Sequence, residues 1–164
     1  MHVSHLLGAG AACAAFGWLL VSPAAPPTPP AEPPAAAGHH VLVVEGDRNA
    51  LTITAASHKP DPWAGVPKGF TSPWRLRIHD AAGTVLADVP LDVGPFDTDA
   101  DAPLRRVRVE GCIVRSGAIG MLVNAPAFAT AASYTFVRPQ GEGEGVVIGT
   151  VTGERVRALA GGGR

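Results

Sequence analysis

The sequence contains only two cysteines, Cys13 and Cys112. Because Cys13 lies in an N-terminal segment that we expect to be removed, Cys112 would be left unpaired, and the mature domain would have no intramolecular disulfide. Residues 109–114 around Cys112 follow an apolar strand pattern, in which a free cysteine behaves as a small buried hydrophobe. The fold must therefore depend on its own hydrophobic core.

A concentration of charge of one sign is also missing. The sequence has 13 lysines and arginines against 14 aspartates and glutamates, a formal net charge of −1, and the basic residues are spread among the acidic ones. We expect no nucleic-acid partner, because phosphate neutralisation needs clustered lysine and arginine. The length leaves room for one domain of about 120 residues. The preference for arginine over lysine, with abundant alanine, glycine and proline, indicates a bacterial source.

Catalytic motifs are absent as well. The sequence has no His-Glu-x-x-His zinc motif, and none of its candidate serines has the glycine neighbours of a Gly-x-Ser-x-Gly nucleophile turn; these serines are Ser57, Ser72, Ser116 and Ser133. We therefore assign no catalytic residue and predict that the protein is not an enzyme. A triad assembled in space is left open by the sequence alone.

An uncharged apolar run at residues 6–21 begins the chain. It is long enough for the core of a signal peptide but glycine-diluted for a membrane span, which needs about 20 strongly apolar residues. Small residues around Ala24 place a cleavage site there, so residues 1–24 are predicted to be a signal peptide. No lysine or arginine precedes the run, so an uncleaved membrane anchor is the alternative. A misplaced start codon and a lipid-modified Cys13 are further alternatives.

A proline- and alanine-rich stretch follows at residues 25–38. Its prolines remove backbone donors and fix φ near the polyproline value, so we expect a disordered spacer. The predicted domain then covers residues 39–160, with a flexible tail at 161–164. The protein is expected to be secreted, periplasmic or at the cell surface, and to contact a membrane only through an uncleaved N-terminal segment.

Apolar and polar residues alternate with a period of two through most of the domain. Trp74, Leu76 and Ile78, for example, are separated by charged or polar residues, which is typical of half-buried antiparallel strands. Further candidate strands lie at residues 41–45, 51–55, 85–89, 106–110, 119–123, 134–137, 146–151 and, as a last short strand, 155–159. No window has a sustained helical period. The sequence predicts an all-β fold, an antiparallel immunoglobulin-like β-sandwich of about seven to nine strands, with a small barrel as the alternative.

Three segments carry a family resemblance. Residues 77–86, with the tight turn Asp80-Ala81-Ala82-Gly83, and residues 123–126 and 131–136 resemble the immunoglobulin-like accessory domains of secreted bacterial metallopeptidases of the immunoglobulin-A-peptidase type. The likeness covers residues 40–160. It implies a non-catalytic accessory or pro-domain role. Peptidase activity is not implied, because the zinc motif is absent.

Alternate carboxylates at Asp97, Asp99 and Asp101 form a candidate calcium site, because Ca²⁺ prefers hard oxygen ligands. The pattern departs from a helix-loop-helix calcium loop at Ala102 and Arg108, where glycine and glutamate belong. A calcium-binding loop at the edge of a sandwich is left open, with Asp92 as a further candidate ligand, as is a simple solvated connection between strands. Apart from this calcium, no cofactor is expected.

The histidines offer a second candidate metal site. His39 and His40 are adjacent, so in a strand they would point to opposite faces and would not share one metal. His58 and His79 are isolated in the sequence. We therefore expect surface histidines rather than a zinc or copper site.

The loop at residues 57–73 is the candidate binding surface. It displays Trp63 and Phe70 among prolines, together with Lys59 and Lys68. Prolines restrict the loop, so its aromatic side chains would lose little entropy on binding a sugar face or an apolar partner. The alternative is that Trp63 and Phe70 fold inward and close one end of the core.

These features predict a non-catalytic, secreted or surface-tethered binding or accessory module that contacts an extracellular protein or glycan. The alternative function is a domain that depends on calcium or zinc, or that is associated with a cryptic hydrolase.

Overall fold

The computed structural model describes residues 35–98, 107–110, 113–141, 143 and 145–162. The chain divides into two compact units, Met1–Ala31 and Glu32–Arg164, and every described residue belongs to the second. The predicted signal or anchor segment, most of the predicted spacer, and Asp99, Asp101 and Cys112 lie outside the described residues. In the part that is described, no helix is long and apolar enough to cross a membrane.

The first sheet contains three strands in the order β2 (Leu51–Lys59), β1 (His39–Gly46) and β7 (Ile119–Pro126). Both outer strands run antiparallel to β1. Leu42 and Val44 of β1 are fully buried, and Val43 between them is partly exposed, because successive side chains point to opposite faces of a strand. Strand β1 is therefore the centre of this sheet, and β7 forms one of its edges.

The second sheet contains four antiparallel strands, in the order β4 (Val85–Pro90), β3 (Arg75–His79), β8 (Ser133–Arg138) and β9 (Val146–Thr152). The alternation predicted around β3 is confirmed, since Leu76 and Ile78 are fully buried. On the polar face the carboxylate of Asp88 lies 3.9 Å from Nε of Arg75 and 3.8 Å from Nε of Arg77.

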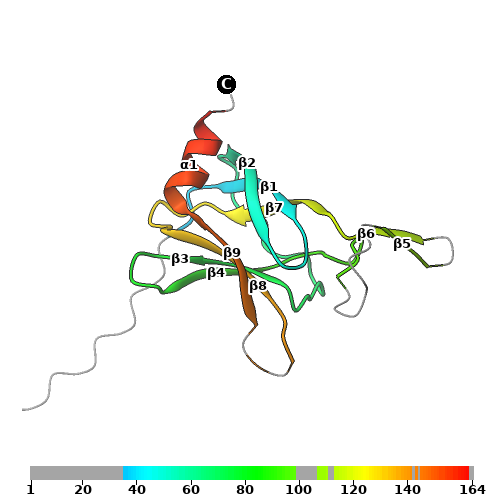
Figure 1. The fold of residues 1–164 in the computed structure, drawn as a ribbon. Coiled ribbons are helices and arrows are strands. Elements are labelled where there is room, and N and C mark those ends of the chain that lie inside the picture. Colours follow the sequence, from blue (N-terminus) through cyan, green and yellow to red (C-terminus); the bar gives the residue numbers. More distant parts are fainter. Residues whose placement is uncertain (1–34, 99–106, 111–112, 142, 144, 163–164) are drawn as a thin grey trace, which may run out of the picture. The chain divides into compact units, whose positions relative to one another are not determined.

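The inward faces of the two sheets share one hydrophobic core, so the predicted all-β sandwich architecture is confirmed (Figure 1). The largest fully buried side chains come from both sheets and from the segments that flank them: Leu42, Val44, Leu76, Ile78, Leu91, Tyr134, Phe136 and Val156.

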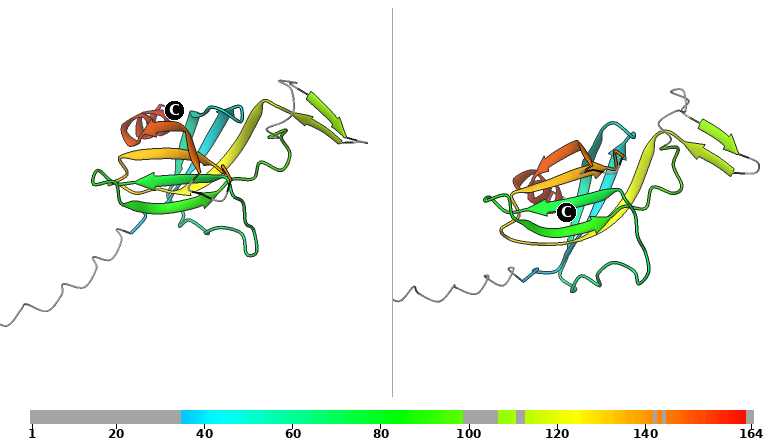
Figure 2. Two further views of the ribbon diagram at one scale, coloured as in Figure 1. Left: turned by 60° about the horizontal axis from the view of Figure 1, so that its bottom comes forward. Right: turned by 90° about the horizontal axis from the view of Figure 1, so that it is seen from below.

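One side of the sandwich is closed by β2 and β9. The backbone of Gly149 in β9 approaches the carbonyl oxygen of Leu51 in β2 so closely that a Cβ at Gly149 would collide with it. The helix α1 (Gly153–Gly161) packs against the same two strands (Figure 2). The other pair of edge strands, β7 and β4, therefore lies on the opposite side of the sandwich.

Residues 155–159 form part of α1, so the last short strand expected from the sequence is wrong. The side-chain oxygen of Thr152 caps the helix by accepting a hydrogen bond of 3.2 Å from the Arg155 backbone N–H. Only Val156 and Leu159 of this segment pack on the core, three residues apart as on one helix face. Such a short helix offers too few apolar positions to reveal its period in the sequence.

Two further strands, β5 (Val107–Glu110) and β6 (Ile113–Ser116), form a separate antiparallel pair before β7. Ser116 at the end of β6 accepts a hydrogen bond of 2.9 Å from the Asp97 backbone N–H and forms an isolated bridge with Phe96. The segment after β4 is thereby held beside the start of β7.

Candidate functional site

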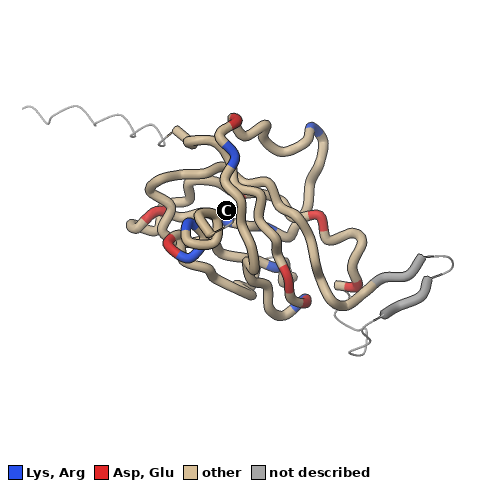
Figure 3. The backbone as a smooth tube through the Cα atoms, turned by 90° about the horizontal axis from the view of Figure 1, so that it is seen from above, with Lys and Arg blue, Asp and Glu red and all other residues tan. Residues whose placement is uncertain are grey.

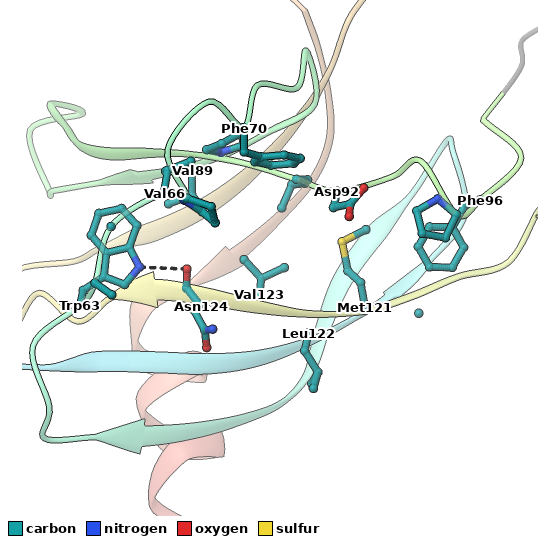
Figure 4. Close-up of a pocket in the computed structure, with 17 residues that line it drawn as sticks. Trp63, Val66, Phe70, Val89, Asp92, Phe96, Met121, Leu122, Val123 and Asn124 are labelled. Carbon is teal, nitrogen blue, oxygen red and sulfur yellow. Dashed lines mark hydrogen bonds between the residues drawn. The ribbon is translucent and has the colours of Figure 1, made fainter.

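A pocket of about 740 Å³ lies between the edge strands β7 and β4, under the loop that joins β2 to β3 (Figure 4). Three segments line it: the loop, the end of β4 with the residues that follow, and the middle of β7. The lining residues that carry the argument below are Trp63, Phe70, Asp92, Met121, Val123 and Asn124.

The loop over the pocket is fixed by several hydrogen bonds. The indole Nε1–H of Trp63 donates to the backbone oxygen of Asn124 at 3.2 Å, as Figure 4 shows. The Phe70 backbone N–H donates to the oxygen of Pro67 at 3.0 Å, which closes a turn. Gly69 in this turn has φ of +81°, a conformation that favours glycine. The loop therefore presents its two aromatic side chains in a defined arrangement.

The structure places both aromatic residues of the loop at half-buried positions. Trp63 is half-buried and packs against the core cluster, as expected for a residue that closes the sandwich. It also lines the pocket, and so does Phe70, which is half-buried but lies outside the core cluster. The two aromatic residues predicted to form a binding surface thus share one cavity.

Lys59 and Lys68 are exposed, and neither is among the residues that line the pocket. Lys59 ends β2, opposite His39 of β1. Lys68 lies in the turn between Pro67 and Gly69. Whether these lysines contact a partner stays a prediction.

The backbone of β7 faces the pocket along its free edge. Within the described residues, β7 pairs only with β1, so the other side of the strand has no strand neighbour. The bond from Trp63 shows that the Asn124 carbonyl points to that free side. Because the backbone groups of successive residues point to alternate sides, those of Gly120 and Leu122 also point outward.

The side chains of β7 point alternately toward the pocket and toward the outer face of the sheet. Val123 is buried and Met121 half-buried, and both point toward the pocket in Figure 4. Leu122 points to the outer face of the sheet and is 72% exposed. An exposed leucine beside outward-facing backbone groups is unusual for an edge strand, which proteins normally protect.

Charge does not distinguish the pocket. Figure 3 shows basic and acidic residues interspersed along the described backbone. Among the described residues of the lining, Asp92 is the only charged one, and its Oδ1 accepts a hydrogen bond of 3.2 Å from the Gly94 backbone N–H. What sets the pocket apart is its apolar lining.

Of the three aspartates of the candidate calcium site, only Asp97 belongs to the described residues. Its side chain is buried, with 7% of the residue exposed, rather than presented to solvent. Within the described ranges, no group of three or more histidine, cysteine, aspartate or glutamate side chains is arranged to hold a metal ion. The calcium site stays a prediction.

The histidines at the start of β1 are not all on the surface. His39 and His40 do point to opposite faces, as expected, but His40 is only 5% exposed and the surface position expected for it is wrong. Its Nδ1 lies 3.3 Å from the hydroxyl of Tyr134, and it pairs across the strands with His58. This register links His40 to a histidine 18 positions away, which the sequence pattern did not indicate.

Sequence reasoning also missed the contribution of β7 and of Phe96 to the pocket. In the sequence these residues resemble ordinary strand and loop positions. Their contribution to the pocket depends on which strand forms the edge of the sheet. Comparisons with protein-family models, with curated proteins and with solved structures found no match for this chain.

Proposed function

We propose that this protein is a non-catalytic binding module that takes up an extended polypeptide segment along the free edge of β7. The ligand adds a strand to the β2-β1-β7 sheet. Alternate side chains of the ligand enter the pocket under Trp63 and Phe70. This mode of recognition combines backbone hydrogen bonds, which give affinity, with pockets for alternate side chains, which give specificity.

The orientation of the Asn124 carbonyl carries the proposal. A donor outside the strand, the Trp63 indole, already bonds to this oxygen. The outward-facing backbone groups of Leu122 and Gly120, two and four residues before Asn124, are therefore available for the same kind of bond. An extended ligand would form hydrogen bonds with the backbone of β7 at Leu122 and Gly120, next to the position that the Trp63 indole occupies.

The lining favours a polypeptide over a glycan. In the part of the lining that the structure describes, the polar side-chain groups are the indole N–H of Trp63 and the side chains of Asp92 and Asn124. The Asn124 side chain points away from the cavity in Figure 4. Sugar recognition needs several convergent polar groups, whereas an apolar peptide side chain needs an apolar wall.

The cellular setting is part of the same proposal. The apolar run and the proline-rich stretch support a module that acts outside the cytoplasm, either secreted or tethered to the surface of a bacterium. The immunoglobulin-like character of the sandwich and an accessory role beside another extracellular protein are supported by the family resemblance of residues 40–160.

The test is selection of peptides on the full chain from a phage-displayed random library, followed by calorimetry with a selected peptide. Gly120→Pro removes one outward N–H at the start of the edge strand, where proline is tolerated. Gly120→Ala is the matched control, since a Cβ at Gly120 meets nothing within 4 Å. We expect Gly120→Pro to weaken binding by roughly tenfold, the value of one hydrogen bond, and Gly120→Ala to bind normally.

Phe70→Ala tests the pocket independently, because Phe70 lies outside the core cluster and its removal should leave the fold intact. We expect loss of peptide binding with unchanged circular dichroism. Failure to select any peptide, or a selected peptide that binds Gly120→Pro and Phe70→Ala as tightly as the wild type, would contradict the proposed function.

A further inference from the structure

A cluster of titratable side chains lies next to the pocket and takes no part in lining it. His40, from β1, is buried against the Tyr134 hydroxyl of β8. The His58 ring, from β2, meets the His40 ring edge-on, with ring centroids 5.5 Å apart. Arg157, from α1, and His39, from β1 itself, also act electrostatically on His40. We call these five residues the His40 cluster.

Hydrogen bonds tie this cluster to the loop that covers the pocket. His39 Nδ1 bonds to the backbone oxygen of Asp61 at 2.9 Å, two residues before Trp63. His58 Nε2 bonds to the backbone oxygen of Ala37 at 2.8 Å. The start of β1 and the root of the loop are therefore held together by histidine side chains.

The register of the first sheet brings the cluster to the other side of the pocket as well. His40 pairs with Ala125 of β7, the residue next to Asn124. Asn124 in turn holds Trp63 through its carbonyl oxygen. A displacement of β1 at His40 would therefore disturb both supports of Trp63, the Asn124 carbonyl and the Asp61 bond.

Protonation of His40 is unfavourable where it lies. Burial lowers its pKa below the ordinary value of 6.5, and the positive charges of His58, Arg157 and His39 lower it further. Tyr134 supplies no compensating charge, because burial raises the pKa of its phenol to about 12 and keeps it neutral. Because only 5% of His40 is exposed, an imidazolium at this position would have little contact with water.

We propose that the His40 cluster makes the pocket sensitive to acid: when His40 takes up a proton, the start of β1 and the root of the loop leave their positions, and the ligand is released. This inference rests on the proposed function for the ligand, but the structural change it describes does not require one. The change is local opening rather than unfolding, because it breaks bonds at the first residues of β1 and leaves the second sheet paired.

Fluorine NMR of the full chain labelled with 5-fluorotryptophan reports on the change directly. The sequence has three tryptophans, Trp18, Trp63 and Trp74. Trp63→Phe and Trp18→Phe assign their resonances. Between pH 8 and pH 5 we expect the Trp63 resonance to change with a midpoint below 6.5, and the resonance of the buried Trp74 to stay constant.

His40→Asn is the test variant, because asparagine keeps a polar partner for Tyr134 and does not titrate. We expect it to abolish the response of Trp63. His79→Asn is the matched control; it removes a histidine from the partly exposed face of β3, opposite the buried face on which Ile78 lies, and should preserve the response. A Trp63 resonance that is insensitive to pH, that responds equally in His40→Asn, or that changes together with Trp74 would overturn the inference.

Calorimetry with a selected peptide separates this inference from the proposed function. We expect wild-type affinity to be about threefold weaker at pH 5.5 than at pH 7.5, as when the open form rises from a minor to a major population, and unchanged in His40→Asn. Equal affinity of the wild type at both pH values would overturn the acid switch and leave the binding function standing. A Trp63 response without any selectable peptide would contradict the binding function and support the switch.

Discussion

Arg157 in α1 donates a hydrogen bond from Nη1 to the backbone oxygen of Ala131, at a distance of 3.0 Å. The same oxygen is approached by Gly153, at the start of the helix, so closely that a Cβ there would collide with it. The helix is thus docked on the loop before β8 by a side-chain bond and by a glycine that permits close backbone contact.

Gly153→Ala should therefore destabilise the domain. The added methyl group would collide with backbone rather than with a flexible side chain, and overpacking of this kind costs about 1–3 kcal/mol. Thermal unfolding followed by circular dichroism measures the effect. Gly161→Ala, at the other end of the same helix, is the control, since a Cβ there meets nothing within 4 Å and should leave the melting temperature unchanged or slightly raised.

The charged face of β3 and β4 should contribute little to stability. Arg75 and Arg77 share Asp88 at 3.9 and 3.8 Å, and all three side chains are more than a third exposed or close to it. Ion pairs at such exposure are screened by solvent and contribute about 0–1 kcal/mol. We expect Asp88→Asn to change the free energy of urea unfolding by less than about 1 kcal/mol. A larger loss would show that the three charges act as a network.

Much of the sandwich was predictable because a strand with one buried and one solvent-exposed face has apolar and polar residues in alternation. Leu76 and Ile78 alternate with arginines, and the tight turn at Asp80 is present, with Oδ1 of that residue accepting bonds from Ala82 and Thr84. The helix α1 was not predictable in this way. Its buried Val156 lies between two arginines, an alternation that a strand would show equally well.

The candidate site was predictable only in part. The proline-bounded loop drew attention to Trp63 and Phe70 because large aromatic side chains in a restricted loop are suited to binding. The other wall of the pocket, β7, depends on sheet order, and the opposition of His40 and His58 depends on register. Both are set by contacts between distant segments, which one sequence does not encode as a local pattern.

The His40 cluster also predicts how stability depends on pH. The folded state lowers the pKa of His40, so below pH 6.5 the unfolded chain binds a proton that the folded domain does not. The contribution of neutral His40 to the free energy of unfolding is fully present above pH 6.5. It decreases as the pH drops below that value and levels off below the pKa of His40 in the folded state. Urea unfolding at a series of pH values measures this dependence.

His40→Asn should flatten the stability profile between pH 8 and pH 5, since the titrating group is gone. The variant is expected to lose some stability at pH 8, where the neutral histidine is well packed. If the profile of His40→Asn falls with acid as steeply as that of the wild type, other groups are responsible for the acid sensitivity.

Trp63 also protects the edge of β7 against unwanted pairing. Its indole occupies the outward-facing carbonyl of Asn124, which shortens the stretch of free backbone to Gly120 and Leu122. Trp63→Ala would uncover that carbonyl and lengthen the exposed edge, and long exposed edges pair with one another. We expect this variant to self-associate in light scattering at concentrations where the wild type is monodisperse. Adding Gly120→Pro to Trp63→Ala should reverse the association, because proline blocks edge pairing; association that persists in the double variant would point to a different surface.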